Sequence, residues 1–228
     1  MRTINNIRNM IAAKYTAGDF TGDTIEIIGD SFIADEPTIF GQLNEDYIKR
    51  EFDWYLSESL NVYDIKGKVP PIWIAHSSKD GLINSNYGFL AFSPENGSQY
   101  LNAMMKLIKD EDSRQATMIY TRPSMHSDWN YDGMSDFVCT NTVQYLIRDN
   151  TLHTVVQMRS NDVVFGYRND YAWQKNIQTQ MFLDLKSMEY PELKLGPIVW
   201  NSASLHVYER HFPLIEKFIS TGEFDVAL

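Results

Sequence analysis

A cysteine and an arginine in two adjacent β-rich segments could form a nucleophilic site. Cys139 is the only cysteine among 228 residues, and Arg159 lies in the β-rich segment that follows it. A thiolate is the nucleophilic form of cysteine, and a nearby guanidinium lowers the pKa of a thiol from its free value of about 8.5. A lone cysteine is more often a small buried hydrophobe. Cys139 by itself therefore leaves both interpretations open.

The turn between the two segments predicts which residues face each other. Asp149-Asn150 is a typical two-residue hairpin turn, and antiparallel pairing across it places Cys139 opposite Ser160. Directly opposed residues project to the same side of a sheet, so the thiol and the hydroxyl would be neighbours. Arg159 would point to the other side unless a β-bulge re-aims it. We therefore predict a bulge near Arg159.

A second candidate group is a carboxylate on an apolar helix face. Tyr47 and Tyr55 lie four residues to either side of Glu51, and Ile48 and Trp54 lie three residues to either side. Helical spacing gathers these side chains around the carboxylate. Burial there would raise the pKa of Glu51, so that it could relay protons through water near neutral pH. The alternative is that the helix turns a different face to the core, which would leave Glu51 partly exposed.

The hydrophobic pattern places these residues in an α+β domain. No internal repeat or linker divides the chain, so we predict one domain over residues 1–228. Helical spacing predicts helices at about 4–15, 43–60, 98–108, 170–186 and 212–218, with loops in most of the stretch up to residue 97. β-Branched and alternating segments predict strands at about 24–32, 116–121, 137–147, 152–165 and 196–208.

Composition limits the compartment and the ligands. The net charge of -10 opposes direct nucleic-acid binding, and one cysteine excludes an intramolecular disulfide framework. The start lacks the apolar core of a signal peptide and no segment has the length of apolar residues that crosses a membrane, so we expect a cytoplasmic protein. An anionic small molecule would need a local cluster of arginines. The candidates are Arg114, Arg122, Arg159 and Arg168.

Several ordered motifs together resemble the thymidylate synthase family. The three main ones are DFVC at residues 136–139, MRSNDVVFG at 158–166 and SLHVY at 204–208. The resemblance spans roughly residues 20–220 and is strongest to the bacteriophage branch of the family, the deoxycytidylate (dCMP) 5-hydroxymethylases. It implies a thymidylate synthase-like fold, in which a large mixed or antiparallel sheet is packed with helices and forms a dimer interface.

The resemblance also implies a covalent mechanism. Cys139 would add to carbon 6 of the pyrimidine, so that carbon 5 can attack the one-carbon unit of 5,10-methylenetetrahydrofolate. Glu51 matches the proton-relaying glutamate of the family, and Tyr87 matches the tyrosine near the proton that carbon 5 loses. No metal is implied.

Other matched positions bind the ligands. They are Arg159 and Ser160 for the phosphate, His206 and Tyr208 for the sugar hydroxyl, and Trp73 and Asp162 for the folate, although Trp73 could equally be a core aromatic. Arg114 matches an arginine that reaches the active site of the partner subunit, which implies a homodimer. The family usually has a second arginine there and another in an N-terminal phosphate loop. Their absence leaves Arg122, Arg168 or a lysine as possible substitutes.

Asp170 stands where the family has the asparagine that reads uracil. Cytosine presents an acceptor at nitrogen 3 and an amino donor at position 4, and a carboxyl group that shares one proton with nitrogen 3 complements both. Against uracil, an ionised carboxylate would face an oxygen lone pair. Asp170 therefore predicts a cytosine nucleotide, provided that the alignment is not shifted by one residue onto Asn169.

The expected product is 5-hydroxymethyl-dCMP together with tetrahydrofolate. The chain ends at Leu228, and residues 72–76 lack the second tryptophan common in the family, so we expect a wetter site in which water completes the reaction. One alternative is a dUMP-directed hydroxymethylase or methylating synthase. Another is a scaffold subunit that binds other nucleotide-synthesis enzymes. The resemblance to the phage branch implies that the protein acts in the cytoplasm of an infected bacterium.

Overall fold

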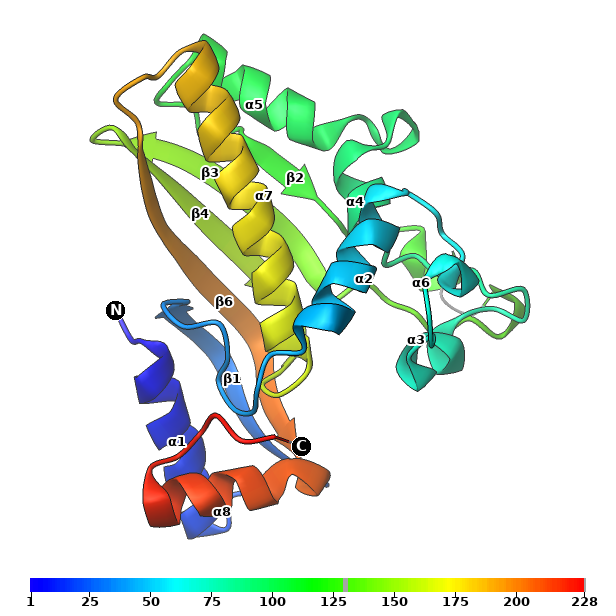
Figure 1. The fold of residues 1–228 in the computed structure, drawn as a ribbon, viewed down its shortest axis with the longest axis vertical. Coiled ribbons are helices and arrows are strands. Elements are labelled where there is room, and N and C mark those ends of the chain that lie inside the picture. Colours follow the sequence, from blue (N-terminus) through cyan, green and yellow to red (C-terminus); the bar gives the residue numbers. More distant parts are fainter. Residues whose placement is uncertain (129–130, 228) are drawn as a thin grey trace. The chain divides into compact units, whose positions relative to one another are not determined.

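The computed structural model describes residues 1–128 and 131–227, which form two compact units (Figure 1). The first unit comprises Met1–Asn44 and Asp149–Leu228, and the second comprises Glu45–Arg148. Within the described ranges, no helix combines the length and the apolar character needed to cross a membrane. That all 228 residues form a single domain stays a prediction.

The first unit is built on a mixed sheet. Its strands are β1 (Thr24–Ile33), β4 (Thr151–Met158), β5 (Asn161–Asp162) and β6 (Lys194–Tyr208). β6 runs antiparallel to β1 and parallel to both β4 and β5. Ile198, Trp200 and Ser202 of β6 are buried in alternation, as expected for a strand with one covered face, whereas Leu205–Val207 are all buried.

Three helices accompany this sheet: α1 (Ile4–Ala17), α7 (Gly166–Met188) and α8 (Phe212–Thr221). α7 lies across one face of β4 and β6, whereas α1 and α8 pack together beside β1 (Figure 1). The covered side of α7 repeats every four residues, with Trp173, Ile177, Met181 and Leu185 all buried. A short 3-10 helix, Glu209–His211, precedes α8.

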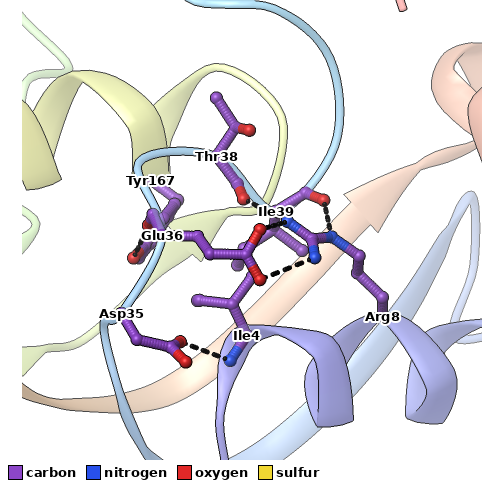
Figure 2. A network of polar contacts seen from close by, with 7 residues as sticks. All are labelled: Ile4, Arg8, Asp35, Glu36, Thr38, Ile39 and Tyr167. Atoms are coloured by element: carbon purple, nitrogen blue, oxygen red, sulfur yellow. Dashed lines mark hydrogen bonds and ion pairs between the residues drawn. The ribbon is translucent and has the colours of Figure 1, made fainter. Parts of the chain in front are cut away.

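A buried arginine connects α1 to the segment that follows β1. Figure 2 shows Arg8, which is 1% exposed, forming two hydrogen bonds with the carboxylate of Glu36, at 2.9 and 2.7 Å. Its guanidinium also donates to the carbonyl oxygens of Ile39 and Thr38, at 2.7 and 2.8 Å. Every guanidinium nitrogen thus has a partner, which is the condition under which a cation can remain buried.

The second unit is mainly helical. Its helices are α2 (Glu45–Leu56), α3 (Pro71–His76), α4 (Tyr87–Phe92), α5 (Gln99–Lys109) and α6 (Met125–Asp128), with 3-10 helices at Val62–Asp64, Pro94–Asn96 and Tyr131–Gly133. Its strands β2 (Thr117–Ile119) and β3 (Thr140–Arg148) are antiparallel, with Met118 opposite Val143. A Cβ atom at Gly88 would lie 1.8 Å from the carbonyl oxygen of Tyr55, so α4 can approach α2 only because residue 88 is glycine.

Most predicted elements are confirmed, but two helices were missed, two element starts were displaced and one predicted strand is divided. The stretch expected to be loops contains α3 and α4, and α7 begins at Gly166 rather than at residue 170. The strand predicted from residue 137 begins at Thr140, so Cys139 lies just before β3 instead of on it. The strand predicted for 152–165 is divided into β4 and β5 by a bend at Arg159.

The turn prediction is confirmed in its conformation. Asp149 and Asn150 have φ values of 51° and 54°, as a type I′ turn requires. At the bend that follows, β4 and β5 keep one register along β6, because Met158 pairs with Ser202 and Asn161 pairs with Leu205. The bulge expected near Arg159, and the pairing of Cys139 with Ser160, stay predictions.

Candidate active site

Glu51 is the buried carboxylate that the helical spacing predicts. It is 3% exposed and accepts a hydrogen bond from the hydroxyl of Tyr47, which in turn accepts one from Nε1 of Trp73 at 2.8 Å. Burial raises the pKa of Glu51 from 4.5 to about 7, although hydrogen bonds from Tyr47, Trp73 and Tyr55 oppose the rise. Glu51 is thus poised to exchange protons near neutral pH.

Tyr87 packs against two other tyrosine rings. It is the first residue of α4, is 4% exposed, and lies between Tyr55 and Tyr120, with ring centroids 5.4 and 5.2 Å away. The hydroxyl of Thr140 donates a hydrogen bond to its oxygen at 3.1 Å. Because Thr140 directly follows the half-buried Cys139, the tyrosine hydroxyl and the thiol belong to one neighbourhood of the second unit.

A buried aspartate connects the segments that carry these two groups. One carboxylate oxygen of Asp136 accepts the backbone N–H groups of Asn84 and Ser85, both at 2.7 Å, and the other accepts the hydroxyl of Ser85 at 2.7 Å. Burial raises the pKa of Asp136 and these hydrogen bonds oppose the rise. The amide oxygen of Asn84 also accepts a hydrogen bond from Arg122 at 2.9 Å. Sequence reasoning missed this role of Asp136, although the residue belongs to the DFVC motif.

In the first unit, Asp170 is held by a buried amide. Nδ2 of Asn161 donates a hydrogen bond to Oδ2 of Asp170 at 2.8 Å. Asn161 is 2% exposed, whereas Asp170 is only half-buried. Asn161 was not among the predicted site residues, since nothing in an asparagine within a strand-like segment indicates what its amide contacts.

The predicted folate contact Asp162 has a structural role at the start of α7. Its carboxylate accepts the backbone N–H groups of Val164, Phe165 and Gly166 at 3.2, 2.9 and 3.4 Å. A carboxylate in this position satisfies donors that a helix start leaves unpaired and interacts favourably with the helix dipole. This explains why α7 begins four residues earlier than its hydrophobic spacing indicated.

The predicted sugar ligands are neighbours on β6. The rings of His206 and Tyr208 lie edge to face, with centroids 5.1 Å apart, as expected for residues two apart on a strand. Nδ1 of His206 lies 3.3 Å from the hydroxyl of Ser204, and the guanidinium of Arg210 lies 4.2 Å from the centroid of the Tyr208 ring. A positive charge therefore flanks this pair.

The predicted residues are distributed over both units. The second unit holds Cys139, Glu51, Tyr87, Trp73 and Arg114, and the first holds Arg159, Ser160, Asp162, Asp170, His206 and Tyr208. Arg159 and Ser160 are half-buried at the bend after β4, and the Arg114 side chain is exposed. In the part of the chain that the structure describes, no group of three or more His, Cys, Asp or Glu side chains is placed to hold a metal ion.

Comparison with known proteins identifies the family of this chain. The family described as thymidylate synthase matches residues 42–227. The deoxycytidylate 5-hydroxymethyltransferase of Enterobacteria phage T4 is 52% identical over 231 residues, which is 99% of this chain and 94% of that protein. The corresponding protein of phage T2 is 53% identical over 97% of this chain and 92% of that protein.

A solved structure supports the fold independently. Thermostable thymidylate synthase A from Bacillus subtilis superposes with a TM-score of 0.63 at 22% identity, covering 85% of this chain and 69% of that chain. The chain therefore belongs to the thymidylate synthase family and has its α+β fold with a mixed sheet and packed helices.

Proposed function

We propose that this protein is a deoxycytidylate 5-hydroxymethyltransferase. It transfers a one-carbon unit from 5,10-methylenetetrahydrofolate to carbon 5 of dCMP with addition of water, and releases 5-hydroxymethyl-dCMP and tetrahydrofolate. The observation that carries this proposal is the similarity to the phage T4 and T2 enzymes of that name, 52% and 53% identical over nearly the whole chain. The folate donor follows from membership of the family.

Cys139 is the proposed nucleophile. Its thiolate adds to carbon 6, and the electron pair of the 5,6 double bond makes carbon 5 an enamine-like nucleophile that attacks the methylene carbon of the folate. Carbon 5 then loses its proton near Tyr87, and tetrahydrofolate leaves to give an exocyclic methylene. Water adds to this methylene as the thiolate departs. The bond between Thr140 and Tyr87 supports the assignment, because it holds the tyrosine oxygen beside the residue that follows the nucleophile.

Glu51 is the proposed proton relay. With a pKa of about 7 it is present in both protonation states near neutral pH, so it can accept and return a proton through water. Trp73, the proposed folate contact, is connected to Glu51 by hydrogen bonds through Tyr47, which supports a second role for Trp73 in setting the pKa of this carboxylate. Binding of the folate against Trp73 would then change the pKa of the Glu51 carboxylate.

Asp170 is the proposed reader of the base. Its carboxylate accepts a hydrogen bond from the amino group of cytosine, and one proton is shared between the carboxyl group and nitrogen 3. The amide of Asn161 supports this role, because a hydrogen-bond donor at 2.8 Å favours an oxygen that acts as an acceptor. A uracil ring would instead present its carbonyl oxygen to that acceptor.

The remaining assignments follow the family. Arg159 and Ser160 bind the phosphate, His206 and Tyr208 bind the sugar hydroxyl, and Asp162 contacts the folate. The enzyme acts as a homodimer in which the sheet forms the interface and Arg114 reaches the neighbouring active site, and it works in the cytoplasm of the infected host bacterium. The exposure of the Arg114 side chain supports its part in a subunit contact.

A competition experiment tests the reaction. The protein is incubated with 5,10-methylenetetrahydrofolate and equal amounts of dCMP and dUMP, and the products are identified by mass spectrometry. We expect 5-hydroxymethyl-dCMP from the natural protein and a shift of roughly 10- to 100-fold towards dUMP in Asp170→Asn, since one mismatched buried polar pair has about this effect on selectivity. Asp184→Asn, the same change elsewhere on α7, is the control and should leave the selectivity unchanged.

Two outcomes would favour the alternatives. A methylated product, or a uracil product from the natural protein, would identify a dUMP-directed synthase or hydroxymethylase. Absence of turnover in the natural protein would leave a scaffold role in a nucleotide-synthesis complex. Turnover that survives Cys139→Ala would instead contradict the covalent mechanism.

A further inference from the structure

We propose that Asn161 is a positioning residue that determines base selectivity by fixing the Asp170 carboxylate. The inference rests on the proposed function. Asn161 is the first residue of β5 and pairs with Leu205 of β6, so its backbone is part of the sheet. Its side chain is almost fully buried, and its Nδ2 lies 2.8 Å from Oδ2 of Asp170.

The start of α7 holds the two side chains in contact. Gly166 and Asp170 are four residues apart and therefore lie on the same face of the helix. A Cβ atom at Gly166 would lie 3.4 Å from Nδ2 of Asn161 and 3.9 Å from Oδ2 of Asp170, so the glycine backbone packs against the hydrogen-bonded pair. Asp162 accepts the N–H of Gly166 and thus fixes the helix start directly after Asn161. The geometry is set by backbone contacts on both sides.

The chemistry of the pair distinguishes the two carboxylate oxygens. An ionised carboxylate only accepts hydrogen bonds, so the amide must present its nitrogen to Asp170. The donor stabilises Oδ2 as an acceptor and disfavours a proton on it. When cytosine binds, Oδ2 is then the oxygen that accepts from the amino group, and the proton shared with nitrogen 3 lies on Oδ1. Uracil, which has a carbonyl in place of the amino group, meets an acceptor that cannot readily become a donor.

The other end of the amide supports a role beyond packing. Oδ1 of Asn161 is buried and has no hydrogen-bond partner in the described part of the chain. A buried acceptor without a partner lowers stability, and an apolar side chain of similar shape would avoid that cost. The bond to Asp170 is the interaction that offsets it. The asparagine thus contributes more by fixing the Asp170 carboxylate than by packing in the core.

An isosteric substitution tests the proposal. Asn161→Asp replaces the donor by a second carboxylate at hydrogen-bond distance, and kcat and KM are measured for dCMP and dUMP. We expect kcat/KM for dCMP to fall roughly 10- to 100-fold and the preference over dUMP to narrow, as for the loss of one hydrogen bond to a charged group. The loss should be smaller at low pH, where a protonated Asp at this position can donate again.

Two further variants make the result decisive. Asn201→Asp is the matched control, because Asn201 lies on β6 and its Nδ2 donates to a backbone oxygen, that of Val156 at 3.3 Å; it should keep the natural selectivity. Combining Asn161→Asp with Asp170→Asn restores the bond with donor and acceptor exchanged. This double variant should prefer dUMP, and by more than Asp170→Asn alone.

The outcomes separate this inference from the proposed function. If the natural protein does not hydroxymethylate dCMP, the proposed function fails whatever the variants do. If it does, and folded Asn161→Asp keeps the natural dCMP preference or loses activity equally on both nucleotides at every pH, the inference alone is overturned. Asn161→Ala, which removes the donor without adding charge, gives the same selectivity test if the aspartate variant does not fold by circular dichroism.

Discussion

Replacing the buried carboxylate of Glu51 by glutamine should stabilise the protein at alkaline pH while impairing catalysis. Glu51 is 3% exposed, and its pKa in the folded protein is raised from 4.5 to about 7 by burial. Glutamine has nearly the same shape and can still accept a hydrogen bond from Tyr47, but it cannot ionise. The substitution therefore removes the cost of a buried charge with little change in packing.

The pKa shift gives the size and the sign of the effect. Because the pKa of this acid is raised on folding, the folded state binds more protons than the unfolded state between pH 4.5 and about 7, and stability falls as the pH rises through this window. The shift corresponds to about 3 kcal/mol once the group is fully ionised. Between about pH 5 and pH 8, Glu51 alone should lower the free energy of unfolding by about 2 to 3 kcal/mol.

Urea unfolding at about pH 5 and pH 8, at one protein concentration, measures this effect. The free energy of unfolding of Glu51→Gln minus that of the natural protein should grow by about 2 to 3 kcal/mol across this range, since other titrating groups cancel in the difference. Glu45→Gln, at the exposed start of α2, is the control and should give a much flatter difference, because this carboxylate is not buried. A Glu51→Gln difference that is equally flat would refute the raised pKa and, with it, the proton-relay argument.

Three other substitutions test the packing and the site. Gly88→Ala should destabilise the protein by about 3 kcal/mol or more in urea unfolding, because its Cβ would lie 1.8 Å from a carbonyl oxygen of α2; an effect below about 1 kcal/mol would contradict the close approach. Arg8→Met should cost about 2 to 3 kcal/mol in the same assay, since it leaves the Glu36 carboxylate without its buried partner, and an unchanged midpoint would argue against the buried pair. Trp73→Phe removes a hydrogen bond that lowers the pKa of Glu51. When Glu51→Gln is compared with Glu51 in the Trp73→Phe background, the pH at which half of the stability change has occurred should be higher than in the natural background. An unchanged value would show that Trp73 does not influence the carboxylate.

The sequence could predict those site features that depend on local periodicity. The burial of Glu51 follows from apolar residues three and four positions away on one helix, and the neighbouring rings of His206 and Tyr208 follow from their spacing on a strand. The turn at Asp149 and Asn150 likewise depends on two adjacent residues. In each case the relevant neighbours are close in sequence, so the pattern contains the contact.

The features that escaped prediction depend on contacts between distant segments or on backbone donors. Asp136 binds Asn84 and Ser85 across about fifty residues, a separation over which side-chain spacing carries no information. The start of α7 was placed too late because hydrophobic spacing does not register the bonds from backbone N–H groups to Asp162. These segments are held by hydrogen bonds between buried polar groups, and the periodicity of hydrophobic residues does not predict which groups pair.

The two-residue strand β5 couples base recognition to sugar recognition in the proposed site. Asn161 pairs with Leu205 and Asp162 pairs with His206, and the N–H of the next residue, Val163, donates to the carbonyl oxygen of His206 at 2.9 Å. A slip of one residue would turn the Asn161 amide to the opposite face of the sheet and separate it from Asp170. The register that keeps the amide on the carboxylate is therefore the same one that sets His206 relative to the start of α7. If the proposed roles of Asp170 and His206 hold, base selectivity and placement of the sugar ligand both depend on this short stretch of backbone pairing.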